Sequence, residues 1–103
     1  MKILAVRCAE EPEVICIKDS LSAKNKFVQG YCQFINISSK ACLICNDDAI
    51  ELRLPPNRIY NGDMIYGDFF IAGLEFSEKD GYSVTDIQDE DINYYEAMFS
   101  LTR

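Results

Sequence analysis

Two prolines followed by an amide and a guanidinium form the most distinctive polar segment of the sequence. Pro55 and Pro56 come directly before Asn57 and Arg58. Because proline fixes the backbone angle φ, such a segment holds its neighbours in one orientation. A guanidinium and an amide presented in this way could recognise a carboxylate, a phosphate or a carbonyl. These four residues are therefore a candidate binding site for a small molecule or a nucleotide.

A structural role is the alternative for the same two polar side chains. Carbonyl groups in a long connection need hydrogen-bond donors, and Asn57 and Arg58 could tie such carbonyls to the body of the domain. A ligand-binding role would instead require a concave pocket beside the prolines. The sequence leaves both interpretations open.

One pair of cysteines has the spacing of a metal or redox motif. Cys42 and Cys45 are separated by two apolar residues, and such a pair can chelate zinc or form a disulfide. However, the chain has no histidine, and side chains three apart on a strand point to opposite faces of a sheet. We therefore expect ordinary core cysteines and no metal site. Since five cysteines are an odd number and no export signal is evident, we expect all of them to be reduced.

Catalytic groupings are hard to build from this composition. Without histidine, neither a Ser-His nor a Cys-His pair can form. The acidic run Asp89, Glu90 and Asp91 lacks the spacing of a calcium-binding loop and is better explained by the dipole of a helix that starts there. The five glycines are scattered singly, so there is no phosphate-binding loop. We therefore expect no enzymatic activity and no cofactor.

The acidic residues are concentrated in the C-terminal part of the chain. The formal net charge is −7; residues 1–60 contain seven acids and eight bases, and residues 61–103 contain ten acids and two bases. Such a surface repels phosphate backbones, so we expect no direct binding of nucleic acid, whereas a basic partner would be steered toward it. Solubility alone would also explain the excess charge. The candidate partner-facing acids are Asp86, Asp89, Glu90 and Glu96.

The elements that position these residues can be read from hydrophobic periodicity and turn residues. Strands are expected at residues 2–8, 13–17, 31–37 and 41–45, and around 69–72. Helices are expected from Asp19 or Ser20 to Gly30, and from Asp86 or Asp89 to about Phe99. Hairpin-length connections dominate the first half. The sequence therefore predicts an α+β fold with about five mainly antiparallel strands and two helices in a single pair of layers, as one domain over residues 1–103.

Each helix has one charged residue within its apolar side. In the first helix, Lys24 interrupts a stripe of Leu21, Phe27 and Val28, and we expect its ammonium group to extend to solvent. In the second helix, Asp91 lies within the apolar arc, where we expect its carboxylate to meet the free amides of the first turn. The arc consists of Ile87, Ile92, Tyr94, Tyr95, Met98 and Phe99.

No segment has the pattern of an export signal or a membrane span. The N-terminal apolar run is interrupted at Arg7, which is too early for a signal peptide. No apolar stretch approaches the roughly 18 residues that cross a bilayer. We expect a soluble protein of the cytoplasm that does not bind membranes.

Five segments together carry a resemblance to a known family. They are Gly30-Tyr31, residues 44–48, residues 54–58, residues 67–73, and residues 89–92 with Tyr95. They resemble the domain of unknown function 3846 family, small proteins of bacteriophages, plasmids and conjugative elements, nearly from end to end. The Leu-Pro-Pro-Asn-Arg block, preceded by an Asn-acid-acid turn, is the most specific part. The sequence departs from the family pattern at Lys24, where an apolar residue is expected, and at Gln29, where a glycine is expected, which implies looser packing of the first helix.

The resemblance implies a genomic setting and, through it, a class of function. Small acidic proteins of phages often bind and block host machinery, and a negative surface can compete with nucleic acid for a basic groove. We therefore expect a non-catalytic interaction protein that inhibits or modulates host machinery such as a defence nuclease, of the anti-restriction or anti-CRISPR type. Its expected partner is a protein in the bacterial cytoplasm, and a partner with a basic nucleic-acid-binding groove would suit the acidic surface. A small-molecule or nucleotide-binding module at residues 55–58 is the alternative, and the oligomeric state is left open.

Overall fold

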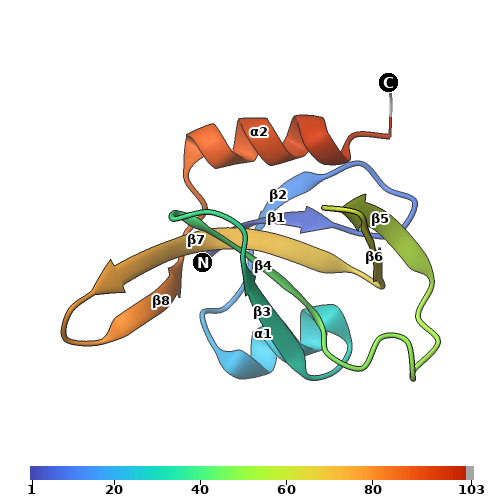
Figure 1. The fold of residues 1–103 in the computed structure, drawn as a ribbon, viewed down its shortest axis with the longest axis horizontal. Helices are drawn as coiled ribbons and strands as arrows, with labels where there is room; N and C mark the ends of the chain where they lie inside the picture. Colours follow the sequence, from blue (N-terminus) through green and yellow to red (C-terminus); the bar gives the residue numbers. More distant parts are fainter. Residues whose placement is uncertain (102–103) are drawn as a thin grey trace.

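The structure is a computed structural model and describes residues 1–101 (Figure 1). The elements in chain order are β1 (Lys2–Val6), β2 (Glu13–Cys16), α1 (Leu21–Val28), β3 (Cys32–Asn36), β4 (Ala41–Asn46), β5 (Pro56–Tyr60), β6 (Asp63–Tyr66), β7 (Phe69–Ser77), β8 (Gly81–Thr85) and α2 (Asp89–Phe99). The two helices and the mainly antiparallel strands confirm the predicted α+β fold.

The main sheet has six strands, and every pairing in it is antiparallel. Its order is β2-β1-β7-β4-β3, and β8 pairs with the distal half of β7. The expected hairpins β1–β2 and β3–β4 are both present. Strands β5 and β6 form a separate two-stranded sheet. The described residues thus form eight strands rather than about five. Strands β5, β6 and β8 were not predicted because polar and turn residues in these segments obscure the alternation of apolar and polar side chains.

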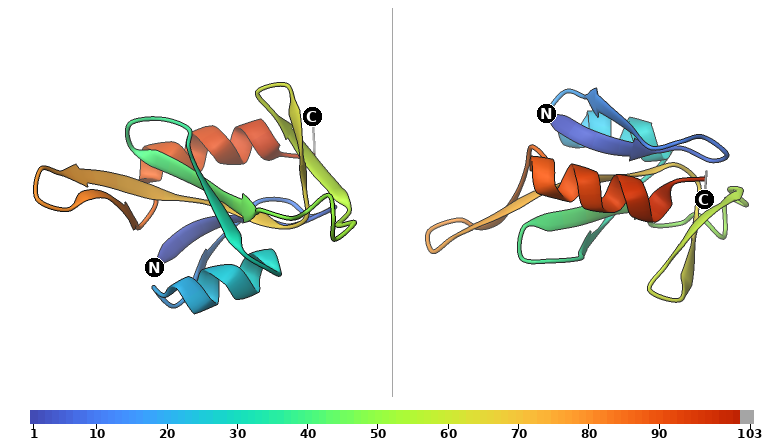
Figure 2. Two further views of the ribbon diagram at one scale, coloured as in Figure 1. Left: turned by 60° about the horizontal axis from the view of Figure 1, so that its bottom comes forward. Right: turned by 90° about the horizontal axis from the view of Figure 1, so that it is seen from above.

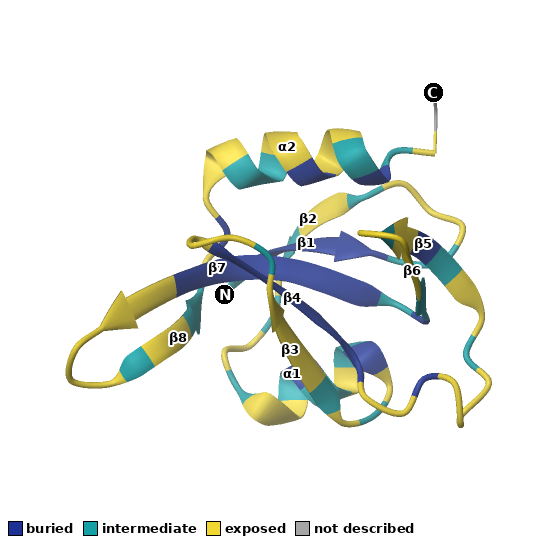
Figure 3. Ribbon diagram, viewed as in Figure 1, coloured by how far each residue is buried: buried dark blue, intermediate teal, exposed yellow. Residues whose placement is uncertain are grey.

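The central strands are buried on both faces, and a helix covers each face. All of β4 and the first six residues of β7 are buried (Figure 3). Helix α2 packs on one face, where Tyr95 and Phe99 join Leu43 and Phe69 in one hydrophobic cluster. Helix α1 packs on the other face, where Val28 joins a second cluster (Figure 2). The sheet therefore packs against one helix on each face. The fold has two helix–sheet layer pairs, and the sheet belongs to both.

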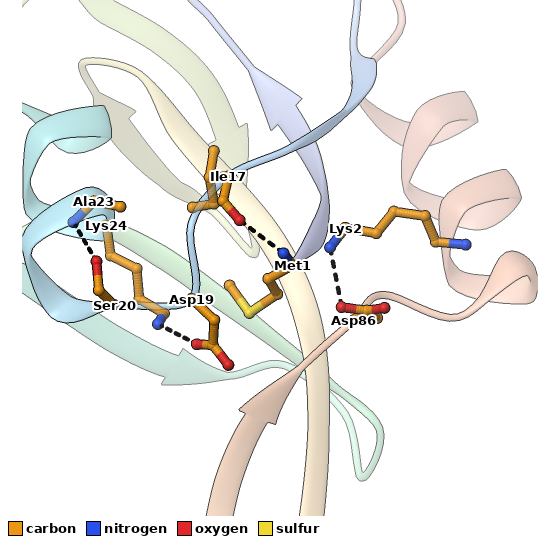
Figure 4. Close-up of polar contacts among 8 residues, drawn as sticks. All are labelled: Met1, Lys2, Ile17, Asp19, Ser20, Ala23, Lys24 and Asp86. Atoms are coloured by element: carbon orange, nitrogen blue, oxygen red, sulfur yellow. Dashed lines mark hydrogen bonds and ion pairs between the residues drawn. The ribbon is translucent and has the colours of Figure 1, made fainter.

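Helix α1 begins where its capping residue predicts, and the left-handed residue that ends it lies one residue before the expected glycine. The hydroxyl of Ser20 accepts a hydrogen bond from the amide of Ala23 (Figure 4), which satisfies one free donor of the first turn. The left-handed residue after the last turn is Gln29, with φ 64°, and not Gly30. Gly30 is required for a different reason: a Cβ there would stand 2.6 Å from Nδ2 of Asn46.

The buried side of α1 differs from the predicted stripe at two positions. Leu21, the first residue of the helix, is 60% exposed. Lys24 is buried, and its ammonium group does not extend freely to solvent: it lies 3.0 Å from a carboxylate oxygen of Asp19 (Figure 4). This pairing compensates for the loss of hydration when a lysine occupies an apolar position.

Helix α2 spans the predicted residues, but two members of its apolar arc behave differently from expectation. Tyr94 is 61% exposed, since its ring packs at the side of Tyr95 and not on the sheet. Asp91 does not satisfy its carboxylate on the first turn, because its Oδ2 atom is buried without a hydrogen-bond partner. Burial raises the pKa of Asp91, and the neighbouring Glu90 raises it further, while Lys40 opposes the shift.

The last hairpin, β7–β8, projects from the body of the molecule (Figure 1). At its base the chain crosses closely over β7, since a Cβ on Gly73 would lie 2.1 Å from the carbonyl oxygen of Asp86. Only a glycine allows this approach. The distal part of the hairpin is mostly exposed (Figure 3).

Candidate functional site

Asn57 joins the second sheet to two segments of the main fold. Its Nδ2 donates hydrogen bonds to the carbonyl oxygens of Val6, at 2.8 Å, and Gly67, at 2.9 Å. One carbonyl ends β1 and the other precedes β7. The amide side chain of Asn57 therefore fixes the start of the β5–β6 hairpin against the sheet.

Arg58 makes a denser set of contacts with backbone carbonyls and is 8% exposed. Its Nε donates to the carbonyl of Phe99 at 2.9 Å, and its Nη2 donates to the carbonyl of Glu10 at 2.6 Å. Its Nη1 donates to Oδ1 of Asn57 at 2.6 Å and, at 3.4 Å, to the carbonyl of Arg7. The guanidinium thus links β5 to the β1–β2 turn and to the end of α2.

The contact with Phe99 also compensates for the dipole of α2. The last four carbonyls of a helix lack partners within it, and a positive charge near them is favourable. Helix α2 has no basic residue in its own last turn, so the guanidinium of Arg58 supplies that charge from another element. Burial lowers the pKa of Arg58, and nearby Glu11 opposes the shift; the group remains charged, as arginine does in proteins.

The structure therefore shows both polar side chains bracing the fold, which is the structural alternative that the sequence left open. A ligand at Asn57 and Arg58 would have to displace the carbonyls that now accept their hydrogen bonds. A hollow of about 360 Å³ between β3 and β6 is lined by other residues. Pro55 and Pro56 are exposed, and the carbonyl of Pro55 accepts a 2.7 Å hydrogen bond from the amide of Gly67.

The same bracing role extends to other residues that carry the family resemblance. Asn46 donates to the carbonyl of Val28 at 2.8 Å and accepts from the amide of Asp48 at 2.7 Å. Asp68 accepts from the amide of Cys8 at 2.9 Å. Gly67, with φ 81°, leaves room for Leu54, whose Cδ1 would lie 2.7 Å from an added Cβ. These motif residues hold elements of the fold together.

Three of the four candidate acids on and before α2 already have partners within the chain. Asp86 accepts a 3.0 Å hydrogen bond from the amide of Lys2 (Figure 4). The ammonium group of Lys2 lies 3.4 Å from Asp89, and that of Lys40 lies 3.2 Å from Glu90.

These pairs are on the surface and leave the carboxylates accessible. The side chains of Asp89 and Glu90 are 91% and 63% exposed, and such pairs contribute only about 0–1 kcal/mol. Glu96 is also exposed, one residue along the helix from the buried Tyr95. The outer face of α2 is therefore an accessible acidic surface.

Cys42 and Cys45 lie on opposite faces of the sheet, as their spacing predicts. Cys42 belongs to the cluster beneath α1 and Cys45 to the cluster beneath α2. Burial raises the pKa of both thiols, and that of Cys45 reaches about 11, so neither is a thiolate at neutral pH. Within residues 1–101, no group of three or more cysteine and acidic side chains is arranged to hold a metal ion.

The β7–β8 hairpin carries an exposed aromatic pair that was not predicted from the sequence. Phe76 and Tyr82 face each other across the hairpin, with ring centroids 5.1 Å apart, and are 63% and 61% exposed. The alternation of Leu74 and Phe76 before a Glu-Lys-Asp-Gly turn, and of Tyr82 and Val84 after it, is the signal that could have found this hairpin.

Comparisons with known proteins place the chain in a family. The family model described as Domain of unknown function (DUF3846) matches residues 1–100. Neither the curated proteins nor the solved structures gave a match. In the described residues, neither helix is long and apolar enough to cross a membrane. Since the match covers nearly the whole chain, and the motif residues brace the observed fold, the protein belongs to the DUF3846 family.

Proposed function

We propose that this protein is a small acidic accessory protein of a phage or mobile element that binds a basic surface of a host protein and blocks it. The partner we propose is a host factor that uses a basic groove to hold nucleic acid, such as a defence nuclease in the bacterial cytoplasm. The supporting observation is the acidic face of α2, where Asp89, Glu90 and Glu96 are exposed while Tyr95 and Phe99 are buried.

The charge distribution supports a protein partner over a nucleic acid. Residues 61–103 contain ten acids and two bases. Carboxylates repel the phosphates of a nucleic acid and attract the lysines and arginines that would otherwise bind those phosphates. An acidic helix face on a rigid sheet can therefore occupy a basic groove in place of its nucleic acid.

A binding role also agrees with how the polar residues are used. The guanidinium of Arg58 and the amide of Asn57 are engaged with backbone carbonyls. The thiols of Cys42 and Cys45 are buried and have raised pKa values. These polar groups are thus used within the fold, whereas Asp89, Glu90 and Glu96 are exposed, which supports recognition through the acidic face.

The proposal is tested by neutralising the face and measuring inhibition. The tagged protein is used to isolate a nucleic-acid-binding protein from a bacterial host, and competition with labelled DNA for the isolated protein is then measured. The variant Asp89→Asn, Glu90→Gln, Glu96→Gln should lose most of the competition, mainly through a slower association rate. The association rate of the parent protein should fall as salt rises, because salt screens the steering by its carboxylates.

A second triple variant controls for net charge. Glu13→Gln, Asp48→Asn, Glu51→Gln removes three exposed acids from the other part of the chain and should compete like the parent protein. Because lost first-turn charges also cost about 0.3–1 kcal/mol each, Tm is measured for both variants. Equal competition by both folded triple variants would overturn the role of α2, and no competition by the parent protein would overturn the proposed function.

A further inference from the structure

The projecting β7–β8 hairpin ends in an aromatic pair that the rest of the described chain leaves uncovered. Leu74 and Val84 face each other nearer the body and belong to, or pack against, the cluster beneath α1. Phe76 and Tyr82 form the next pair on the same side of the hairpin. They extend the apolar stripe of the core beyond the part of the sheet that α1 covers.

The exposure of this pair is costly unless a partner covers it. Phe76 and Tyr82 are 63% and 61% exposed, and their rings meet edge to face at 62°. A partner that buries either ring would remove apolar surface from water, which favours binding. The edge-to-face arrangement also presents ring faces on which a flat group can stack.

Acidic residues lie next to this aromatic pair along the chain, at the tip of the hairpin. The turn contains Glu78, Lys79 and Asp80, and Glu75 projects from the opposite face of β7. Three acids and one base thus lie within a few residues of the two rings, and all four are exposed. A cation that stacks on an aromatic ring here would also find carboxylates to accept its hydrogen bonds.

We propose that the β7–β8 hairpin docks an arginine-bearing segment of a partner protein on Phe76 and Tyr82. A guanidinium is flat and weakly hydrated, so it stacks on an aromatic face while its edge donates to carboxylates such as Glu78 and Asp80. A lysine ammonium cannot stack in this way. The inference rests on the proposed function in taking the partner to be basic, but it names a second surface with its own specificity.

Charge decides against the other occupants of this surface. Nucleic-acid bases also stack on aromatic rings, but the acids of the turn repel the accompanying phosphates. A second copy of the chain would bring two acidic turns together in a protein whose net charge is −7. An arginine-bearing segment satisfies the rings and the carboxylates together.

The test uses two peptides that differ only in their cation. Isotope-labelled protein is titrated at low salt with a peptide of four Arg-Gly repeats and with a peptide of four Lys-Gly repeats, and NMR shifts are followed. The arginine peptide should shift the ring signals of Phe76 and Tyr82 and bind several-fold more tightly than the lysine peptide. Phe76→Thr and Tyr82→Thr should each weaken it several-fold.

Control variants separate this inference from the proposed function. Tyr31→Thr removes an aromatic residue that is 73% exposed elsewhere and should leave peptide binding unchanged. Equal binding of both peptides, or unchanged binding by folded Phe76→Thr and Tyr82→Thr, would overturn the inference. If the triple variant of α2 alone loses the peptide, the hairpin inference fails and the proposed acidic face stands. Concentration-dependent self-association, or binding of single-stranded DNA that Tyr82→Thr abolishes, would also overturn it.

Discussion

At the scale of single residues, the structure assigns Arg58 to the fold. A buried guanidinium with four hydrogen bonds, three of them to carbonyls of other segments, is costly to remove because those carbonyls then lose their donors. The sequence indicated a stiff segment with two strong donors but not where the donors point. A charged side chain beside prolines can hold backbone segments in place as readily as it can recognise a ligand.

Replacing Arg58 by alanine should therefore destabilise the protein. Losing a hydrogen bond to a charged group costs about 1.5–3 kcal/mol, which lowers Tm by roughly 10 °C in a domain of this size. Arg58→Lys should recover only part of the loss, since an ammonium cannot reproduce the planar fork. Thermal unfolding followed by circular dichroism measures both, with the exposed Arg53→Ala as control. An Arg58→Ala protein that melts like the parent would contradict the bracing role.

Asp91 should make the protein less stable as pH rises. Its pKa is raised by burial and by Glu90, so the folded state favours the protonated carboxyl. This contribution is fully present below the unfolded pKa of about 3.9 and is lost as pH rises through the higher pKa of the folded state. An unpartnered buried oxygen costs about 1–3 kcal/mol, more than the roughly 0.3–1 kcal/mol gained from the helix dipole.

The variant Asp91→Asn tests this sign. It should melt a few degrees above the parent at pH 7, and the difference should shrink as pH falls toward 3, where the parent's carboxyl is protonated. Comparison with the parent at each pH removes the effects of the other acids. A difference in Tm that stays constant from pH 3 to pH 7 would show that the ionisation of Asp91 does not matter for stability.

At the scale of elements, the two helices show how far local signals reach. Ser20 caps α1 and the acids of the first turn begin α2, as predicted from residues within one turn of each end. The sequence places the end of α1 one residue too late, because a glycine normally takes the left-handed position after a helix. Here Gln29 takes it, and the side chain of Asn46 excludes a Cβ from Gly30.

Gln29→Gly should stabilise α1. A left-handed backbone costs a residue with a Cβ about 1–2 kcal/mol, and the greater flexibility of glycine in the unfolded chain returns about 0.4–1 kcal/mol of that gain. A net gain near 0.5–1 kcal/mol should raise Tm by about 4 °C. Gln29→Ala keeps the Cβ and should show no gain. Equal Tm values for the two variants would indicate that the backbone at Gln29 is not strained.

At the scale of the whole molecule, one sheet separates two hydrophobic clusters. Helix α1 covers one face, α2 and the β5–β6 hairpin lie over the other, and β7–β8 extends past both (Figure 2). Two alternating sets of side chains on the same central strands build the two hydrophobic clusters, so β4 and β7 read as continuous apolar runs. The acids of α2 and of the β7–β8 turn are left on the outside.

Local signals in the sequence predict the fold class, the two helices, the first two hairpins, the divergence of Cys42 and Cys45, and the family. Each depends on periodicity, a cap, a turn or a motif that neighbouring residues define. The folded chain shows that Arg58 is a brace, which the sequence could not, since its carbonyl partners lie 41 to 51 residues away in the chain. The folded chain also shows that Phe76 and Tyr82 stay exposed. Burial depends on which parts of the assembled sheet the helices leave uncovered, and no local sequence pattern indicates this.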